Sequence, residues 1–172
     1  MNISKAVVPV LREQGSGHIF QVPSLSARVS GPGLTAYQAA KSAIVGFSSG
    51  LAHEIAPFGV KLTVLEPGGM RTDWAGSSMT IPQPSTPYQP TIEPFAELIR
   101  ATSGQEVTDP RRVAQLVRDL AGRGDVPMRL LLGTDAVPMA KETAQGLAAN
   151  DDAWRDVSLS VSDQTPPTGD TS

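Results

Sequence analysis

Two short apolar segments joined by one long helical pattern constrain the fold of this chain more than any other feature. The segments are residues 18–22 and 60–66, and apolar positions between residues 35 and 57 recur at helical spacing. Short apolar runs of this kind are typical of buried strands. A helix that connects two strands of one sheet makes a right-handed crossover between parallel strands. The sequence therefore predicts an α/β fold with a parallel sheet.

Further helices and one more strand are expected around this unit. Asp109 before Pro110 predicts a helix start, because aspartate caps free N–H groups and proline fits the first helical position. Thr35 is the expected cap of the central helix. The other expected elements are a helix at residues 3–14, a helix that ends before Gly122, a strand at residues 129–132, and a last helix that follows Thr134 or Asp135, reaches about Ala149 and stops at Asn150.

The composition favours one globular domain and excludes several kinds of partner. Hydrophobic residues make up 40% of the chain and charged residues 18%. With a net charge of −3 and no basic patch, we expect neither nucleic acid nor an anionic membrane as a partner. There is no cysteine, which excludes disulfides and thiolate metal sites. No leader or spanning segment is recognisable, so a cytoplasmic protein is expected. Residues 162–172 lack apolar side chains and predict a disordered tail.

Ser24, Tyr37 and Lys41 are the side chains whose chemistry points to a reaction. At positions i and i+4 of a helix, Tyr37 and Lys41 share one face, and an ammonium beside a phenol stabilises the phenolate. Tyr37 is therefore a candidate general acid and base. Ser24 follows the first strand, at the sheet edge where ligands bind in open α/β sheets. Its hydroxyl would hold a substrate oxygen against the phenol.

These three residues are followed by the run PGGMRT at residues 67–72, each on the expected kind of element. Together they resemble the active-site half of the short-chain dehydrogenase/reductase family, whereas a lone YxxxK pattern is common by chance. The resemblance implies a doubly wound, Rossmann-like parallel sheet, of which residues 1–161 would be the C-terminal part with about three strands. It also implies an oxidoreductase that uses NAD or NADP and acts on a small-molecule carbonyl or alcohol.

The resemblance gives each residue a role. Ser24 would orient the substrate oxygen, Tyr37 would transfer the proton, and Lys41 would favour the phenolate and bind the nicotinamide ribose. The residues that would contact the cofactor are Tyr37, Lys41, Pro67, Gly68 and Thr72.

Residues 74–94 contain scattered prolines without helical or strand periodicity and predict a long loop. Loops of more than about 12 to 15 residues in compact domains are usually functional or disordered. By resemblance this loop is the substrate lid, and Trp74 and Met79 join Ser24 as candidate substrate contacts. A Trp74 that covers the core is the alternative.

The central helix carries two stripes. A stripe of large residues is expected in the core, namely Ala40, Ile44, Phe47, Leu51 and Ile55. A stripe of small residues would let another helix approach closely, namely Ala39, Ala43, Gly46 and Gly50. By resemblance this helix forms a homo-oligomer interface, and contact within one chain is the alternative.

One departure from the family's pattern concerns the cofactor. The glycine-rich turn that cradles dinucleotide phosphates is absent from this chain and would lie upstream of Met1. Gln21 and Pro23 also stand where the family usually has Asn and Ser. The alternative to an enzyme is therefore a truncated, non-catalytic remnant that retains only the dimerising helices.

Two other chemistries find little support. The run GFSSG at residues 46–50 matches G-x-S-x-G, but a nucleophile elbow requires a strand, a sharp turn and a helix, and this run lies inside a helix. His18 and His53 lack a third ligand at metal spacing, so no metal site is expected.

Overall fold

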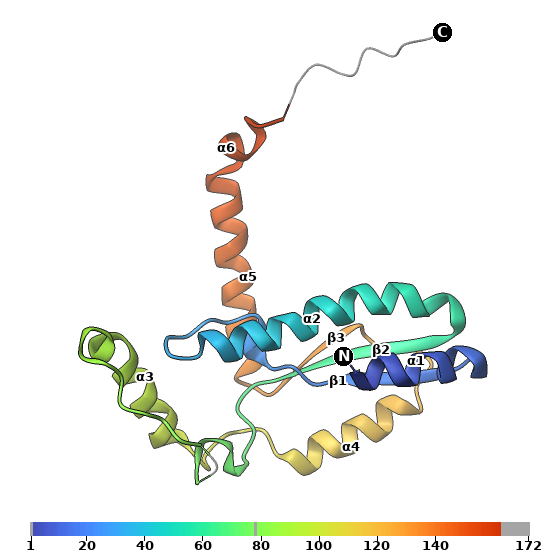
Figure 1. Cartoon of the computed structure of the whole chain (residues 1–172), viewed down its shortest axis with the longest axis horizontal. Coiled ribbons are helices and arrows are strands. Elements are labelled where there is room, and N and C mark those ends of the chain that lie inside the picture. Colours follow the sequence, from blue (N-terminus) through green and yellow to red (C-terminus); the bar gives the residue numbers. More distant parts are fainter. Residues whose placement is uncertain (1, 78, 163–172) are drawn as a thin grey trace.

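In the computed structural model, a three-stranded parallel sheet in the order β1-β2-β3 lies at the centre of the fold (Figure 1). The strands are β1 (Gly17–Gln21), β2 (Val60–Pro67) and β3 (Arg129–Leu132). Ile19 of β1 lies opposite Leu62 of β2, and Leu65 of β2 lies opposite Leu130 of β3. The predicted α/β fold with three parallel strands is confirmed.

Helices cover both faces of this sheet. The structure describes residues 2–77 and 79–162. Helices α1 and α2 pack on one face and α4 packs on the other, whereas α5 and α6 project away from the sheet (Figure 1). The helices are α1 (Asn2–Gln14), α2 (Thr35–Ile55), α3 (Gln89–Thr102), α4 (Pro110–Ala121), α5 (Ala136–Ala153) and α6 (Arg155–Leu159). Short 3-10 turns are η1 (Leu25–Ala27), η2 (Ala56–Phe58), η3 (Asp73–Ala75) and η4 (Thr86–Tyr88).

The central strand β2 is buried on both faces, as its apolar sequence requires. Val64 packs with Val45 and Ile55 of α2, whereas the next residue, Leu65, packs with Leu120 of α4. Successive side chains of a strand point to opposite faces, so one strand anchors both helical layers. Burial of each such side chain contributes about 1.5 to 3 kcal/mol.

The predicted core stripe of α2 is confirmed at Ile55 and is wrong by one position at Ile44 and Phe47. Val45, Ser48 and Ile55 are the buried residues of this helix. Of the predicted stripe, Ala40 is exposed, Ile55 is buried, and the remaining members are only partly buried. Ser48 is fully buried although its hydroxyl counts as polar, and a hydropathy pattern therefore misplaces the stripe.

Several predicted helix ends also need correction. Thr35 is the first residue of α2, and the cap position is taken by Leu34 without a side-chain hydrogen bond. The expected loop at residues 74–94 gives way to helix α3 from Gln89 onwards. Pro90 is accepted in the first turn, where N–H groups have no helical partner, and Pro94 removes only one helical hydrogen bond.

The last long helix runs past its expected stop. Asn150 lies inside α5, which continues to Ala153. Asparagine is only weakly unfavourable in a helix, and the neighbouring alanines favour one. The predicted tail at residues 162–172 falls, apart from Ser162, outside the described residues.

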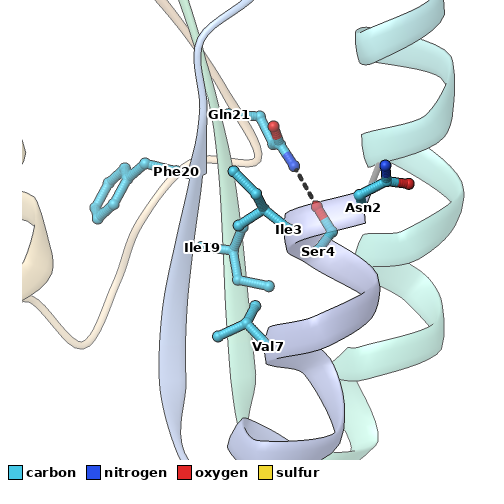
Figure 2. Close-up of a pocket in the computed structure, with 7 residues that line it drawn as sticks. All are labelled: Asn2, Ile3, Ser4, Val7, Ile19, Phe20 and Gln21. Atoms are coloured by element: carbon cyan, nitrogen blue, oxygen red, sulfur yellow. Dashed lines mark hydrogen bonds between the residues drawn. The ribbon is translucent and has the colours of Figure 1, made fainter.

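A hollow lies beside β1, on the face that α1 covers (Figure 2). Gln21 of β1 donates a hydrogen bond from Nε2 to the Ser4 Oγ of α1 at 2.9 Å. The apolar part of the lining is formed by Ile3, Val7, Ile19 and Phe20. In the described part of the chain β1 pairs with β2 alone. One side-chain hydrogen bond thus joins the first turn of α1 to β1, which has a strand partner on one edge in the described part of the chain.

The carboxylate of Glu66 lies fully buried between two arginines near the end of β2. Arg28 donates to Glu66 Oε2 from Nε at 3.0 Å and from a terminal nitrogen at 2.5 Å. Arg129 of β3 donates to Oε2 from Nε at 3.2 Å and also bonds Oε1. Burial raises the pKa of Glu66, but the hydrogen bonds and charges of the two arginines outweigh it, so the net pKa is lowered.

We expect Glu66→Gln to lower the free energy of unfolding by about 2 to 3 kcal/mol, because it removes the buried negative charge that pairs with two arginines, which keep partial access to water. The pKa of Glu66 is lower when folded, so its ion pairs stabilise the fold above the ordinary value of 4.5. This contribution is lost as the pH falls through the folded pKa. Urea denaturation at neutral and acidic pH measures both effects. Exposed Asp125→Asn is the control, and equal effects of the two variants would contradict the prediction.

His18 of β1 gives a second pH dependence. Thr63 Oγ1 donates its only hydrogen to the Pro127 carbonyl at 2.8 Å. His18 Nε2 lies 2.9 Å from Thr63 Oγ1 and is therefore the donor in that hydrogen bond. Burial and the positive charge of Lys61 lower the pKa of His18, and the Leu120 carbonyl opposes them only in part. The neutral ring therefore stabilises the fold above the ordinary pKa of 6.5.

We expect the protein to lose stability as the pH falls below the ordinary pKa of histidine, about 6.5, toward the lower folded value of His18. His18→Gln keeps a donor for Thr63 but does not titrate. Urea midpoints measured at about pH 7.5 and 5.5 should therefore differ less in this variant than in the wild type. His53→Gln, which alters the other, exposed histidine, should behave as the wild type. An equal pH dependence in His18→Gln would refute the assignment.

Candidate functional site

A cleft of about 520 Å³ opens at the carboxyl ends of β1 and β2. Its walls come from the segments that follow these strands, from the first turns of α2 and from α3 and α5. The residues of this cleft that the sequence singled out are Ser24, Tyr37, Lys41, Pro67, Gly68, Thr72 and Trp74. Segments far apart in the sequence are thus brought to the sheet edge where open α/β folds bind ligands.

Ser24 is held at the start of the 3-10 turn that follows β1. Pro23 before it is buried, and Leu25 after it packs with Ala136 and Ala140 of α5. Ser24 Oγ accepts a hydrogen bond from the Ser26 amide at 3.1 Å. A hydroxyl has one donor and two acceptor positions. Its hydrogen can therefore still be donated to a group in the cleft.

Tyr37 and Lys41 lie one turn apart at the start of α2 and are both partly buried. Lys41 Nζ lies 5.4 Å from the centroid of the Tyr37 ring. The Trp74 ring also lies near the phenol, with 5.8 Å between the two ring centroids. The predicted sharing of one helix face by the phenol and the ammonium is confirmed.

The turn at Gly68 and Gly69 forms another part of the cleft wall. The Gly68 amide donates to the Leu132 carbonyl at 2.9 Å, which continues the pairing of β2 with β3. Thr72 Oγ1 accepts from the Trp74 amide at 3.3 Å and so begins the turn η3. Thr72 and Trp74 are consequently positioned by the same short segment.

The position of Met79 differs from that of the other predicted residues, because Met79 does not line the cleft. Its amide donates to the Gly76 carbonyl at 3.2 Å. Its role as a substrate contact stays a prediction. Apolar residues of α3 form much of the wall in its place, namely Phe95, Leu98 and Ile99. The scattered prolines hid this helix, although its amphipathic pattern from Ile92 onwards was a usable signal.

Asp135 lines the cleft, although the sequence predicted it only as a possible helix cap. It occupies the predicted cap position of α5 but makes no side-chain bond to that helix. Its Oδ2 accepts instead from the Gly69 amide at 2.8 Å. Glu106 also lines the cleft near this turn. The cleft that contains Lys41 is therefore lined by carboxylates as well as hydroxyls.

The structure argues against the nucleophile elbow of a hydrolase. Ser48, the serine of the G-x-S-x-G match, is fully buried in the middle of α2 and cannot act as an exposed nucleophile. No group of three potential metal-binding side chains occurs within residues 2–77 and 79–162. In the same ranges no helix is long and apolar enough to cross a membrane.

Comparison with known proteins finds a family match and a similar curated protein. Residues 1–80 match the family described as short chain dehydrogenase. Oxidoreductase BOA17 of Botryotinia fuckeliana is 56% identical over 157 residues, which are 91% of this chain and 57% of that protein. The chain thus spans little more than half the length of this curated relative.

Solved structures agree with this result. A short-chain dehydrogenase from Streptomyces avermitilis matches with a TM-score of 0.82 and 32% identity, over 92% of this chain and 57% of the other. A short chain dehydrogenase from Burkholderia cenocepacia in complex with NADP matches with a TM-score of 0.52 and 25% identity, over 90% and 54%. The sequence match, the parallel sheet and the cleft at its edge agree, and the chain belongs to the short-chain dehydrogenase family.

Proposed function

We propose that this chain carries the proton-transfer half of an NAD(P)-dependent oxidoreductase that interconverts a carbonyl compound and an alcohol. The observation that carries the proposal is the meeting of Ser24, Tyr37 and Lys41 in one cleft with the turn at Gly68. Ser24 follows β1, and the other two residues begin α2. This combination of a hydroxyl, a phenol and an ammonium suits proton transfer to a substrate oxygen.

Each side chain has a distinct part in the proposed reaction. The Ser24 hydroxyl donates a hydrogen bond to the substrate carbonyl oxygen and fixes its place. The Tyr37 hydroxyl gives its proton to the same oxygen as negative charge develops there. The Lys41 ammonium stabilises the phenolate that remains. In alcohol oxidation the proton moves back to Tyr37.

The residues of the cleft fit the nicotinamide end of a dinucleotide. Lys41 offers an ammonium for ribose hydroxyls, and Thr72 offers a hydroxyl for the carboxamide. The Gly68 and Gly69 turn leaves room because it carries no side chains into the cleft. When bound, the nicotinamide supplies or accepts the hydride. The structural relative in complex with NADP supports a cofactor of this class.

The substrate would lie between the catalytic side chains and α3. Trp74, Phe95 and Leu98 give this wall an apolar and aromatic surface. We propose that residues 74–94 act with α3 as a cover over a substrate that has an apolar part beside its carbonyl or hydroxyl. Ser24 and Trp74 would contact this substrate directly.

A homo-oligomer through α2 is also proposed. The small-residue stripe of this helix, Ala39, Ala43, Gly46 and Gly50, is exposed along its whole length. A Cβ placed on Gly46 or Gly50 would meet nothing within 4 Å. Glycine costs about 1 kcal/mol against alanine in a helix, and close approach by a second copy of the helix supplies a reason for it.

We expect Tyr37→Phe to reduce carbonyl turnover by at least about a hundredfold, because general acid catalysis contributes about 10² to 10⁴. The affinity for NADH or NADPH should stay within a few-fold, since the phenol does little of the binding. The full-length protein is assayed with a panel of aldehydes and ketones, and cofactor binding is followed by calorimetry. Exposed Tyr88→Phe is the matched control. Turnover that stayed within tenfold of the wild type would remove Tyr37 from its role.

Lys41→Ala should damage both turnover and cofactor affinity, because the ammonium would contact the ribose as well as the phenolate. A loss of about tenfold or more in each is expected. The same assays measure both quantities, with exposed Lys141→Ala as the control. An effect on turnover alone would contradict the double role.

A further inference from the structure

We propose that Asp135 is a positioning residue, which fixes the Gly68 and Gly69 turn on the wall of the cleft. This proposal rests on the proposed function, because the turn is taken to face the nicotinamide. Asp135 follows β3 and lies 66 positions from Gly69, yet its Oδ2 accepts the Gly69 amide hydrogen at 2.8 Å. A hydrogen bond to a charged acceptor is stronger than one between neutral groups.

The two polar backbone groups of Gly69 are both engaged by distant segments. Its amide is bound by Asp135, and its carbonyl accepts from the Thr108 amide at 3.2 Å. The Thr108 carbonyl in turn accepts from the Arg71 amide at 2.9 Å. Glycine has the widest backbone freedom of any residue. The orientation of this turn therefore depends on these bonds and not on its own conformational preference.

The shape of the slot around the Asp135 carboxylate supports this role. A Cβ on Gly68 would lie 2.3 Å from Oδ2, and a Cβ on Gly133 would lie 2.3 Å from Oδ1. Gly133 also has φ +119°, which other residues rarely adopt. The Asp135 carboxylate fits in its observed position because both Gly68 and Gly133 lack a Cβ atom. A partly buried carboxylate is costly unless it is hydrogen-bonded, and its bond to Gly69 offsets part of that cost.

The position of the turn bears directly on the reaction. Gly68, Gly69 and Asp135 line the same cleft as Ser24 and Tyr37. A shift of about 1 Å in reacting groups can cost about a hundredfold in rate. Loss of the Asp135 bond should therefore lower kcat more than it changes the KM of the carbonyl substrate.

The kinetic test uses the full-length protein and the aldehyde or ketone that it reduces best. We expect Asp135→Ala to lower kcat by about 10- to 100-fold, with KM within about threefold. Asp135→Asn keeps an oxygen acceptor for the Gly69 amide and should stay within about threefold of the wild type in kcat. Asp151→Ala, which removes an exposed carboxylate from the same helix, should have no effect. Asn and Ala variants with equal losses would overturn the proposal.

Hydrogen exchange of the Gly69 amide tests the contact independently of activity. Asp135→Ala should speed this exchange by at least about tenfold, whereas the Val64 amide in β2 should be unchanged. Unchanged Gly69 exchange would overturn the proposal. Faster exchange with an unaltered kcat would overturn it as well and would leave the proposed function standing. If Tyr37→Phe retains activity, the proposed function fails, and Gly69 exchange still reports on the contact.

A double-mutant cycle removes the ambiguity of a variant that folds poorly. Gly68→Ala places a methyl group against the Asp135 carboxylate and should lower kcat in the wild-type background. In the Asp135→Ala background the same methyl group meets a smaller side chain, so the additional loss should be at least about tenfold smaller. Additive losses would show that the two residues do not act through one contact and would overturn the proposal.

Discussion

The buried carboxylate of Glu66 is the constraint on which the geometry of the site depends. It accepts hydrogen bonds from Arg28, which follows the turn of Ser24, and from Arg129 of β3. A single buried charge would be strongly destabilising, and two guanidinium groups make it tolerable. The next residues of the chain are Pro67 and Gly68. One ionic cluster thus joins the segment that carries Ser24, the end of β2 and the neighbouring strand β3.

A second carboxylate acts further along the same edge. Asp135 binds Gly69 from the end of β3, so both ends of the short run from Glu66 to Gly69 are held by charged groups from outside β2. Between them the Gly68 amide extends the β2–β3 pairing through the Leu132 carbonyl. This part of the cleft wall therefore continues the pairing of the sheet.

The sequence was sufficient for the features that depend on local patterns. Apolar runs located the three strands, helical spacing located α2, and the pair Tyr37 and Lys41 on one helix face followed from their separation alone. The Arg28 and Asp135 contacts were beyond reach, since each joins residues more than 30 positions apart and no local pattern marks the partner. Helix α3 was missed because its prolines suggest a loop, and tertiary context overrides that preference.

Two parts of the cleft wall have different physical characters, and this difference suits the proposed reaction. Tyr37 and Lys41 project from a helix that is anchored to the sheet through Val45, Ser48 and Ile55. Another part of the wall, at Gly68 and Gly69, presents backbone atoms, and Asp135 and Thr108 hold Gly69 in place. In the proposed reaction, proton transfer requires a side chain that reaches the substrate oxygen. The nicotinamide ring of the proposed cofactor requires a surface from which no side chain projects. Placing the two on separate, independently fixed elements lets each meet its own requirement.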